Sequence, residues 1–146
     1  MTSQPVEILL VEDNEDDIVI IHEAFAEARL VNVMKTVRDG EEALAYLAHQ
    51  GKHKKASMPA LILLDINMPK KNGFEVLKEM KADPQLRQLP VIMLTTSESE
   101  EDIARSYANG ACSYIRKPVD FDQFAKVVKQ FEMYWTLVSR IPSNKG

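Results

Sequence analysis

The stretch ALILLD, at residues 60–65, is the most apolar run of the chain and ends in an acidic residue. Its apolar residues are consecutive and do not alternate with polar ones, which is typical of a strand buried on both faces of a parallel sheet. We therefore expect a central strand over residues 60–64, with Asp65 at its carboxyl end.

Shorter apolar runs on both sides of this stretch repeat the pattern. Short continuous apolar runs bounded by polar or turn-forming residues favour buried strands. The further strands are expected over residues 6–11, 33–37, 91–94 and 112–116, and the fourth of the five finishes at Thr95 and Thr96.

Segments with helical spacing or helix-capping residues separate these strands. Asp39 with Glu42, and Asn72 with Glu75, have the three-residue spacing of a capping residue and its partner at the start of a helix. A polar, lysine-bearing stretch over residues 49–59 is expected to be a loop. Helices are expected over residues 15–29, from 39, over 72–81, over 99–110 and from 120 onward.

Five strands that alternate with five helices indicate an α/β fold, in which a doubly wound parallel sheet carries helices on both faces. The flavodoxin-like strand order 2-1-3-4-5 is one of two common orders, and periodicity alone does not choose between them. No composition shift marks a domain boundary, so we expect a single domain over residues 1–146. Its core should lie over about residues 6–136, with a C-terminal helix extension and tail over about 132–146.

The composition excludes several classes of function. A formal net charge of −4 offers no basis for bulk binding to nucleic acid or to an anionic membrane. The single cysteine excludes an internal disulfide framework and suits a reducing compartment. The N-terminus does not resemble a signal peptide, and no apolar run approaches the ~20 residues that span a bilayer. We expect a cytoplasmic protein.

Polar residues stand at the carboxyl ends of four of the expected strands. In such sheets, sites form at this edge, near the point where the strand order reverses. Grouped carboxylates repel one another, and Mg²⁺ relieves that repulsion. Phosphoryl transfer uses a metal, an ammonium group and a hydroxyl, and a carboxylate nucleophile gives an acyl phosphate. The residues are Glu12 and Asp13, then Asp65, then Thr95, and finally Lys117.

Four short motifs carry these residues: VEDN at residues 11–14, LLDINMP at 63–69, MLTTS at 93–97 and KPVD at 117–120. Their order and separations resemble those of the response-regulator receiver domains of two-component signalling, from about residue 7 to residue 131. The resemblance implies a phosphoacceptor signalling protein that promotes its own phosphorylation and dephosphorylation, and that is not otherwise an enzyme. Its phosphodonor would be the phosphohistidine of a histidine kinase.

The resemblance also implies a role for each acidic residue. Asp65 would be the phosphoacceptor. Asp13 would bind Mg²⁺ directly, together with Asp65, and Glu12 would act mainly through water. Asn67 would contribute its backbone carbonyl to the metal.

The same resemblance implies a switch. Thr95 would bond to the phosphoryl oxygen and move on activation, and Lys117 would pair with the phosphate. The Lys117-Pro118 bond is expected to be cis, which is accessible at X-Pro. Tyr114 would be the aromatic residue that changes with Thr95.

The C-terminal helix is expected to carry two apolar stripes, although one sheet face requires only one. A second stripe indicates a homodimer or partner surface, with the tail folding back on its own domain as the alternative. The extended tail and the lysine-bearing loop are similar to the stand-alone regulators of phytochrome-type histidine kinases. That resemblance implies dimerisation through the fourth helix, fifth strand and fifth helix. The expected interface residues are Tyr114, Phe131, Tyr134 and Trp135.

Two output modes remain open, because only PSNKG follows Ile141. Output would be contact with an effector protein, or onward transfer to a histidine phosphotransfer protein. A dehalogenase-type phosphatase or a flavin-binding protein could share the architecture. However, the phosphatase requires an aspartate where this chain has Asn67, and flavin binding requires a hydroxyl- and glycine-rich loop where it has acids.

Overall fold

The computed structural model describes residues 6–27, 32–49, 58–96, 100–111, 113–119 and 121–128. Its five strands form one sheet in the order β2-β1-β3-β4-β5, and every neighbouring pair is parallel. The flavodoxin-like order is therefore confirmed. The reversal of strand order falls between β1 and β3, where sites form in sheets of this kind.

Strands and helices alternate along the described chain. The strands are β1 (Val6–Val11), β2 (Asn32–Val37), β3 (Leu61–Asp65), β4 (Val91–Thr95) and β5 (Ser113–Arg116). The helices are α1 (Glu15–Glu27), α2 (Gly40–Leu47), α3 (Gly73–Ala82), α4 (Glu100–Ala108) and α5 (Phe121–Val128). The expected elements agree with these within a residue or two wherever the structure describes both ends.

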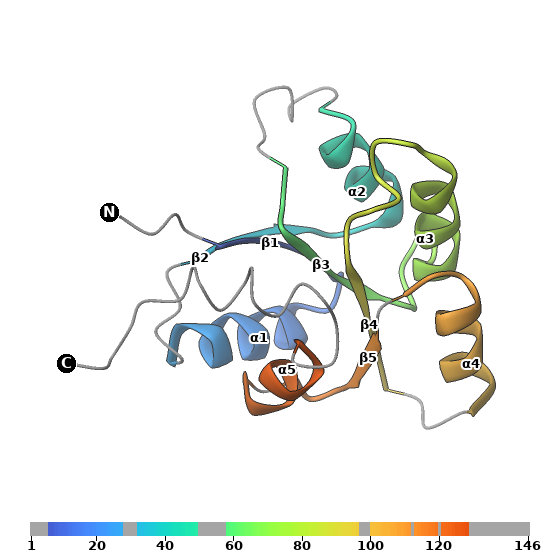
Figure 1. Cartoon of the computed structure of the whole chain (residues 1–146). Coiled ribbons are helices and arrows are strands. Elements are labelled where there is room, and N and C mark those ends of the chain that lie inside the picture. The colour runs from blue at the N-terminus through green and yellow to red at the C-terminus, as the bar shows by residue number, and fades with distance from the viewer. Residues whose placement is uncertain are drawn as a thin grey trace.

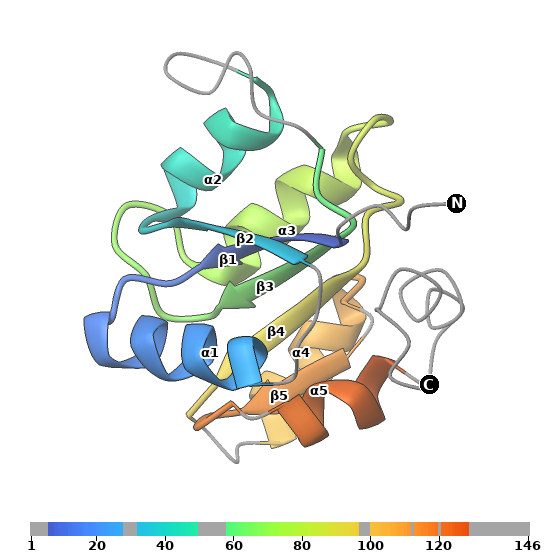
Figure 2. The same ribbon diagram turned by 90° about the vertical axis from the view of Figure 1, so that its left-hand side faces the viewer.

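Helices cover both faces of the sheet, as Figures 1 and 2 show. Helices α1 and α5 lie on one face, where Phe25 and Phe124 pack with their ring centroids 4.8 Å apart. Helices α2, α3 and α4 lie on the other. Because successive strand residues point to opposite faces, β3 sends Leu61 and Leu63 into one core and Ile62 and Leu64 into the other. This explains why its sequence is continuously apolar.

Local capping fixes where two of the helices begin. Asp39 accepts a hydrogen bond from the Glu42 N–H at 2.8 Å. Asn72 and Glu75 form a reciprocal capping box, in which each side chain accepts a bond from the other residue's N–H at 3.0 Å. Both caps were expected from the three-residue spacing.

A glycine holds the turn after β3 close to the end of that strand. The Gly73 N–H donates to the carbonyl of Ile66 at 2.8 Å. A Cβ atom on Gly73 would lie 2.4 Å from the backbone oxygen of Asp65. Any larger residue would therefore displace the backbone that carries Asp65.

Within the described part of the chain, no helix is both long and apolar enough to cross a membrane.

Candidate functional site

Three carboxylates meet at the carboxyl edge of the sheet. Val11 and Leu64 are register partners, so Glu12 and Asp65 follow them side by side. Glu12 is fully buried and Asp65 is almost so, whereas Asp13 is exposed. One carboxylate oxygen from each of these three acids lies within 4.8 Å of the others. The sequence-predicted acids are therefore gathered in one cluster.

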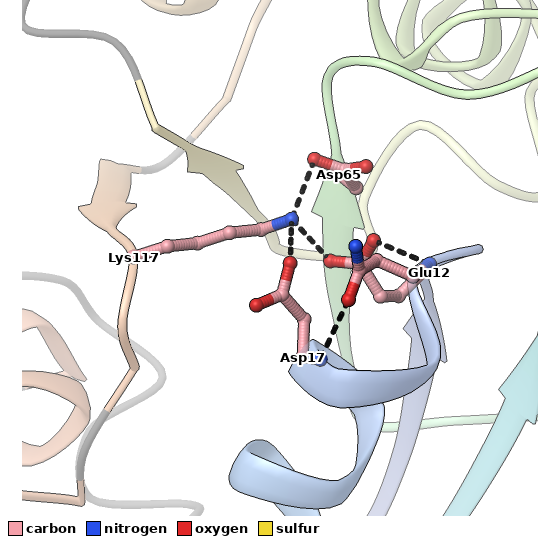
Figure 3. A network of polar contacts seen from close by, with 5 residues as sticks. Glu12, Asp17, Asp65 and Lys117 are labelled. Carbon is pink, nitrogen blue, oxygen red and sulfur yellow. Dashed lines mark hydrogen bonds and ion pairs between the residues drawn. The ribbon is translucent and has the colours of Figure 1, made fainter.

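Lys117 reaches this cluster from the residue after β5. Figure 3 shows its extended side chain directed at three carboxylates from α1, the end of β1 and the end of β3. Its Nζ atom lies 2.5 Å from Oε1 of Glu12, 2.9 Å from Oδ2 of Asp17 and 3.2 Å from Oδ1 of Asp65. The Lys117 side chain is only 8% exposed. The ammonium group donates a hydrogen bond to Asp17 and forms ion pairs with Glu12 and Asp65.

The electrostatics of the site disfavour a fully ionised cluster. Burial, and next the negative charge of Glu12, raise the pKa of Asp65 to about 7, although Lys117 opposes the shift. Burial lowers the pKa of Lys117, but its bonds to the carboxylates of Glu12 and Asp17 outweigh this and raise it above its usual value. Lys117 is therefore a permanent cation at neutral pH. Asp65 is poised between its charged and neutral forms.

This excess of negative charge fits a divalent cation. Hard cations prefer oxygen ligands, and Mg²⁺ usually takes one or two carboxylates and keeps several waters. The exposed Asp13 leaves one side of the cluster open to solvent, where such waters can lie. Asn67 is also exposed and lies two residues beyond Asp65, in the loop between β3 and α3. The residues present therefore fit a hydrated metal ion.

Thr95 ends β4, the strand between β3 and β5. Asp65 pairs in register with Leu94, and Thr95 pairs with Arg116, so Thr95 stands one step beyond Asp65 at the same edge. It is 2% exposed, and its carbonyl accepts the Lys117 N–H at 2.8 Å. The Lys117-Pro118 bond is cis, as expected.

Tyr114 lies on β5 and is half-buried. Its ring meets that of Tyr107, from α4, edge to face, with the centroids 6.1 Å apart and the planes at 84°. The Tyr107 side chain is one of the exposed large apolar groups of the described chain, at 48%. The two rings border an open cavity of about 380 Å³ between α4, β5 and α5. The aromatic pair thus links the expected switch residue to the surface.

Two residues at or near the site were not predicted from sequence. Asp17 is one, because an acid in the first turn of a helix is explained by the helix dipole alone. Tyr107 is the other, since an exposed tyrosine in a polar helix shows no pattern. Phe131, Tyr134 and Trp135 of the expected interface lie outside the described residues, as do Ser97, Ser99, Cys112 and Asp120.

The sheet order, with acids, a hydroxyl and a lysine at its carboxyl edge, defines a receiver domain. In agreement, the family model of the response regulator receiver domain matches residues 8–129. The chain therefore belongs to this family, whose members are signalling proteins.

Two relatives match over nearly the full chain. The chain is 40% identical to "Probable methanogenesis regulatory protein FilR2" of Methanothrix harundinacea, over 94% of this chain and 88% of the relative. It is 37% identical to "Response regulator Rcp1" of Synechocystis, over 97% of each.

Solved structures of phytochrome response regulators are also similar. The bacteriophytochrome response regulator RtBRR superimposes with a TM-score of 0.82, at 39% identity over 95% of this chain and 85% of that one. The phosphorylated cyanobacterial phytochrome response regulator RcpA gives 0.78, at 46% identity over 96% and 100%. The Mn²⁺-bound form of Rcp1 gives 0.77, at 38% identity over 95% and 100%.

Proposed function

We propose that this chain accepts a phosphoryl group on Asp65 from the phosphohistidine of a histidine kinase. The observation that carries this proposal is the contact of the buried Asp65 with Lys117 inside a cluster of carboxylates. A buried acid without a partner would destabilise the fold. An acid next to a fixed cation and to a cluster of carboxylates that can bind a metal ion has the groups that phosphoryl transfer uses.

The reaction is a displacement at phosphorus. An Asp65 carboxylate oxygen forms the new O–P bond while the P–N bond to the histidine breaks. The imidazole nitrogen keeps the electron pair and is protonated from solvent. Lys117 supplies positive charge next to the three transferred oxygens, and Thr95 supplies a hydroxyl at the same edge. Asp65 must be ionised to attack.

Mg²⁺ is the metal that we propose for the cluster. When bound, it neutralises charge on the transferred oxygens. Asp13, Asp65 and the backbone carbonyl of Asn67 would be its direct ligands, with Glu12 acting mainly through water. The Mn²⁺-bound structure of the related Rcp1 supports a divalent cation in this setting.

The phosphorylated state would be read out through Thr95 and Tyr114. In this proposal β4 and β5 have two alternative packings, and a phosphoryl group that bonds to Thr95 favours one of them. The arrangement of the Tyr114–Tyr107 pair that belongs to this packing would then become more populated. The pair lies at the surface between α4 and β5. An effector protein that binds this surface would then distinguish the two states.

The kinase that we propose is of the phytochrome type, on the strength of the similarity to RtBRR, RcpA and Rcp1. The test is phosphotransfer from purified, autophosphorylated histidine kinases of several sensor classes, compared at short times. Fastest transfer from the phytochrome kinase supports the pairing. Preferential transfer from a kinase of another sensor class contradicts it.

We further propose that the chain acts in the cytoplasm as a homodimer, with Tyr114, Phe131, Tyr134 and Trp135 at the interface. The support is the second apolar stripe of the C-terminal sequence and the exposed Tyr107 beside Tyr114. Light-scattering mass with and without Mg²⁺ and beryllofluoride tests it. A mass equal to one chain throughout contradicts the dimer.

Return of phosphate to a histidine phosphotransfer protein would favour a relay over contact with an effector.

A further inference from the structure

Asp17 contacts the ammonium group of Lys117 without belonging to any of the sequence motifs. Its Oδ2 atom accepts a hydrogen bond from Lys117 Nζ at 2.9 Å, and Figure 3 shows it approaching from the first turn of α1. The contact is shorter than the 3.2 Å that separates Lys117 from Asp65. Asp17 is also partly shielded, since its side chain is 24% exposed.

Helix capping does not account for this acid. Asn14 caps α1, because its side chain accepts the Asp17 N–H at 2.9 Å. In a complete capping box, the side chain at the position of Asp17 would bond back to the N–H of the capping residue. Here the Asn14 N–H donates to Oε2 of Glu12 at 3.2 Å instead. The Asp17 carboxylate is directed to Lys117.

Asp17 also stands apart from the metal cluster. Among the described residues, the acids close enough to share a cation are Glu12, Asp13 and Asp65. A cation bound there competes with Lys117 for Glu12 and Asp65, but it does not compete for Asp17. Asp17 is therefore the carboxylate partner that Lys117 retains when the site is loaded.

We propose that Asp17 is a positioning residue, which holds the Lys117 ammonium so that its remaining N–H donor is directed at the group on Asp65. This inference rests on the proposed function of Asp65. One donor of Lys117 stays with Asp17, for which the cation does not compete, and another is free to bond to the phosphoryl oxygen that replaces the Asp65 oxygen. Without Asp17, the long lysine side chain loses the one carboxylate partner that the cation leaves to it.

Removing Asp17 has two effects, and they must be separated. Loss of its negative charge favours an anion on Asp65, whereas loss of its oxygen releases Lys117. Asp17→Asn and Asp17→Ala remove the same charge, but only the asparagine keeps an oxygen that can accept from Lys117. The difference between these two variants therefore isolates positioning.

The experiment measures beryllofluoride affinity at saturating Mg²⁺, and separately Mg²⁺ affinity alone, by calorimetry. We expect Asp17→Ala to bind beryllofluoride about three- to tenfold more weakly than Asp17→Asn, the range for one hydrogen bond. We expect the two variants to bind Mg²⁺ equally, since Asp17 is outside the cluster. Asp16→Asn and Asp16→Ala form the matched control pair, because Asp16 is an exposed acid in the same turn. That pair should show equal affinities.

Equal beryllofluoride affinity in Asp17→Asn and Asp17→Ala would overturn the inference. So would an equal loss of Mg²⁺ and beryllofluoride affinity in Asp17→Ala, because that pattern indicates general damage to the site. If Asp17→Ala melts well below Asp17→Asn, Asp17→Ser replaces it, with the same expected weakening, since its shorter side chain does not reach Lys117. Failure of the unaltered protein to bind beryllofluoride would instead contradict the proposed role of Asp65.

Discussion

The ammonium nitrogen of Lys117 lies 3.2 Å from Oδ1 of Asp65. The contact reaches across the end of β4, because Lys117 follows β5, Asp65 ends β3, and β4 lies between these two strands. Lys117 is also bonded to Glu12 and Asp17, so one buried cation holds the ends of three segments together. The same charge that stabilises the metal-free site is thus available to a phosphoryl group on Asp65.

Replacing Lys117 by alanine should destabilise the metal-free protein by about 3 kcal/mol at neutral pH, because breaking a buried ion pair leaves uncompensated charge. Denaturant unfolding in EDTA measures this. Lys78→Ala, at an exposed position of α3, is the control and should have little effect. Saturating Mg²⁺ should recover part of the loss, and a Lys117→Ala protein as stable as the unaltered one would contradict the electrostatic account.

The pKa of Asp65 makes cation binding depend on pH. The pKa is raised from 3.8 to about 7 in the folded protein, first by burial and next by Glu12. Protons and Mg²⁺ compete for this carboxylate, so Mg²⁺ affinity should fall as pH drops below about 7, by up to about tenfold per pH unit. Calorimetric titration across this range checks it. In Asp65→Asn the dependence should flatten, and an unchanged slope would assign the proton to another group.

The raised pKa of Asp65 also determines the direction in which folding stability changes with pH. A carboxyl whose folded pKa is raised penalises the folded state above that pKa, and the penalty is relieved as pH falls through about 7 toward 3.8. In EDTA, Asp65→Asn should therefore be more stable than the unaltered protein at pH 8, by roughly 1–3 kcal/mol after allowance for solvent screening. The gain should shrink toward pH 5. A gain that is independent of pH would contradict this cause.

Asp13 should contribute to Mg²⁺ affinity but not to the stability of the metal-free fold. Its side chain is exposed, so Asp13→Asn should leave unfolding in EDTA unchanged within about 0.5 kcal/mol. Mg²⁺ at a hundredfold excess over its dissociation constant should stabilise the unaltered protein by ~2.7 kcal/mol, and most of that gain should be lost in the variant. Asp16→Asn, in the first turn of α1, should keep the full gain. Thermal melting with and without Mg²⁺ measures both.

Thr95 should couple the phosphorylation site to the aromatic pair. Thr95→Ala removes its hydroxyl, and Thr95→Ser keeps it at the same buried position. Beryllofluoride should shift the NMR resonances of Tyr107 and Tyr114 in the unaltered protein and in Thr95→Ser. The shifts should be much smaller in Thr95→Ala even when beryllofluoride is saturating. Full shifts in Thr95→Ala would place the coupling elsewhere.

The strands, the helices and the main site residues could be predicted from the sequence because their signals are local, whereas local signals do not choose the strand order. The run ending at Asp65 is continuously apolar because both faces of β3 are covered. The caps at Asp39 and Asn72 depend on residues three positions away. Parallel strand ends share one edge, so acids and a lysine that follow strands must gather there.

The partners of those residues could not be predicted in the same way. The bond from Lys117 to Asp17 depends on where the first turn of α1 lies relative to the end of β5, which no local pattern encodes. The same applies to Tyr46, whose hydroxyl donates to Glu7 at 2.8 Å between α2 and β1. Lys70 has a positive φ of 66° without being glycine, and no local sequence pattern predicts that conformation.

Phosphorylation of Asp65 is tested by the intact mass of the protein after incubation with Mg²⁺ and a small phosphodonor, such as acetyl phosphate. We expect a gain of one phosphoryl group in the unaltered protein and in Asp16→Asn, none in Asp65→Asn, and none in EDTA. The modification should also be removed by hydroxylamine, which cleaves an acyl phosphate. Equal labelling of Asp65→Asn, or no labelling of a folded protein that binds Mg²⁺, would contradict phosphorylation at Asp65.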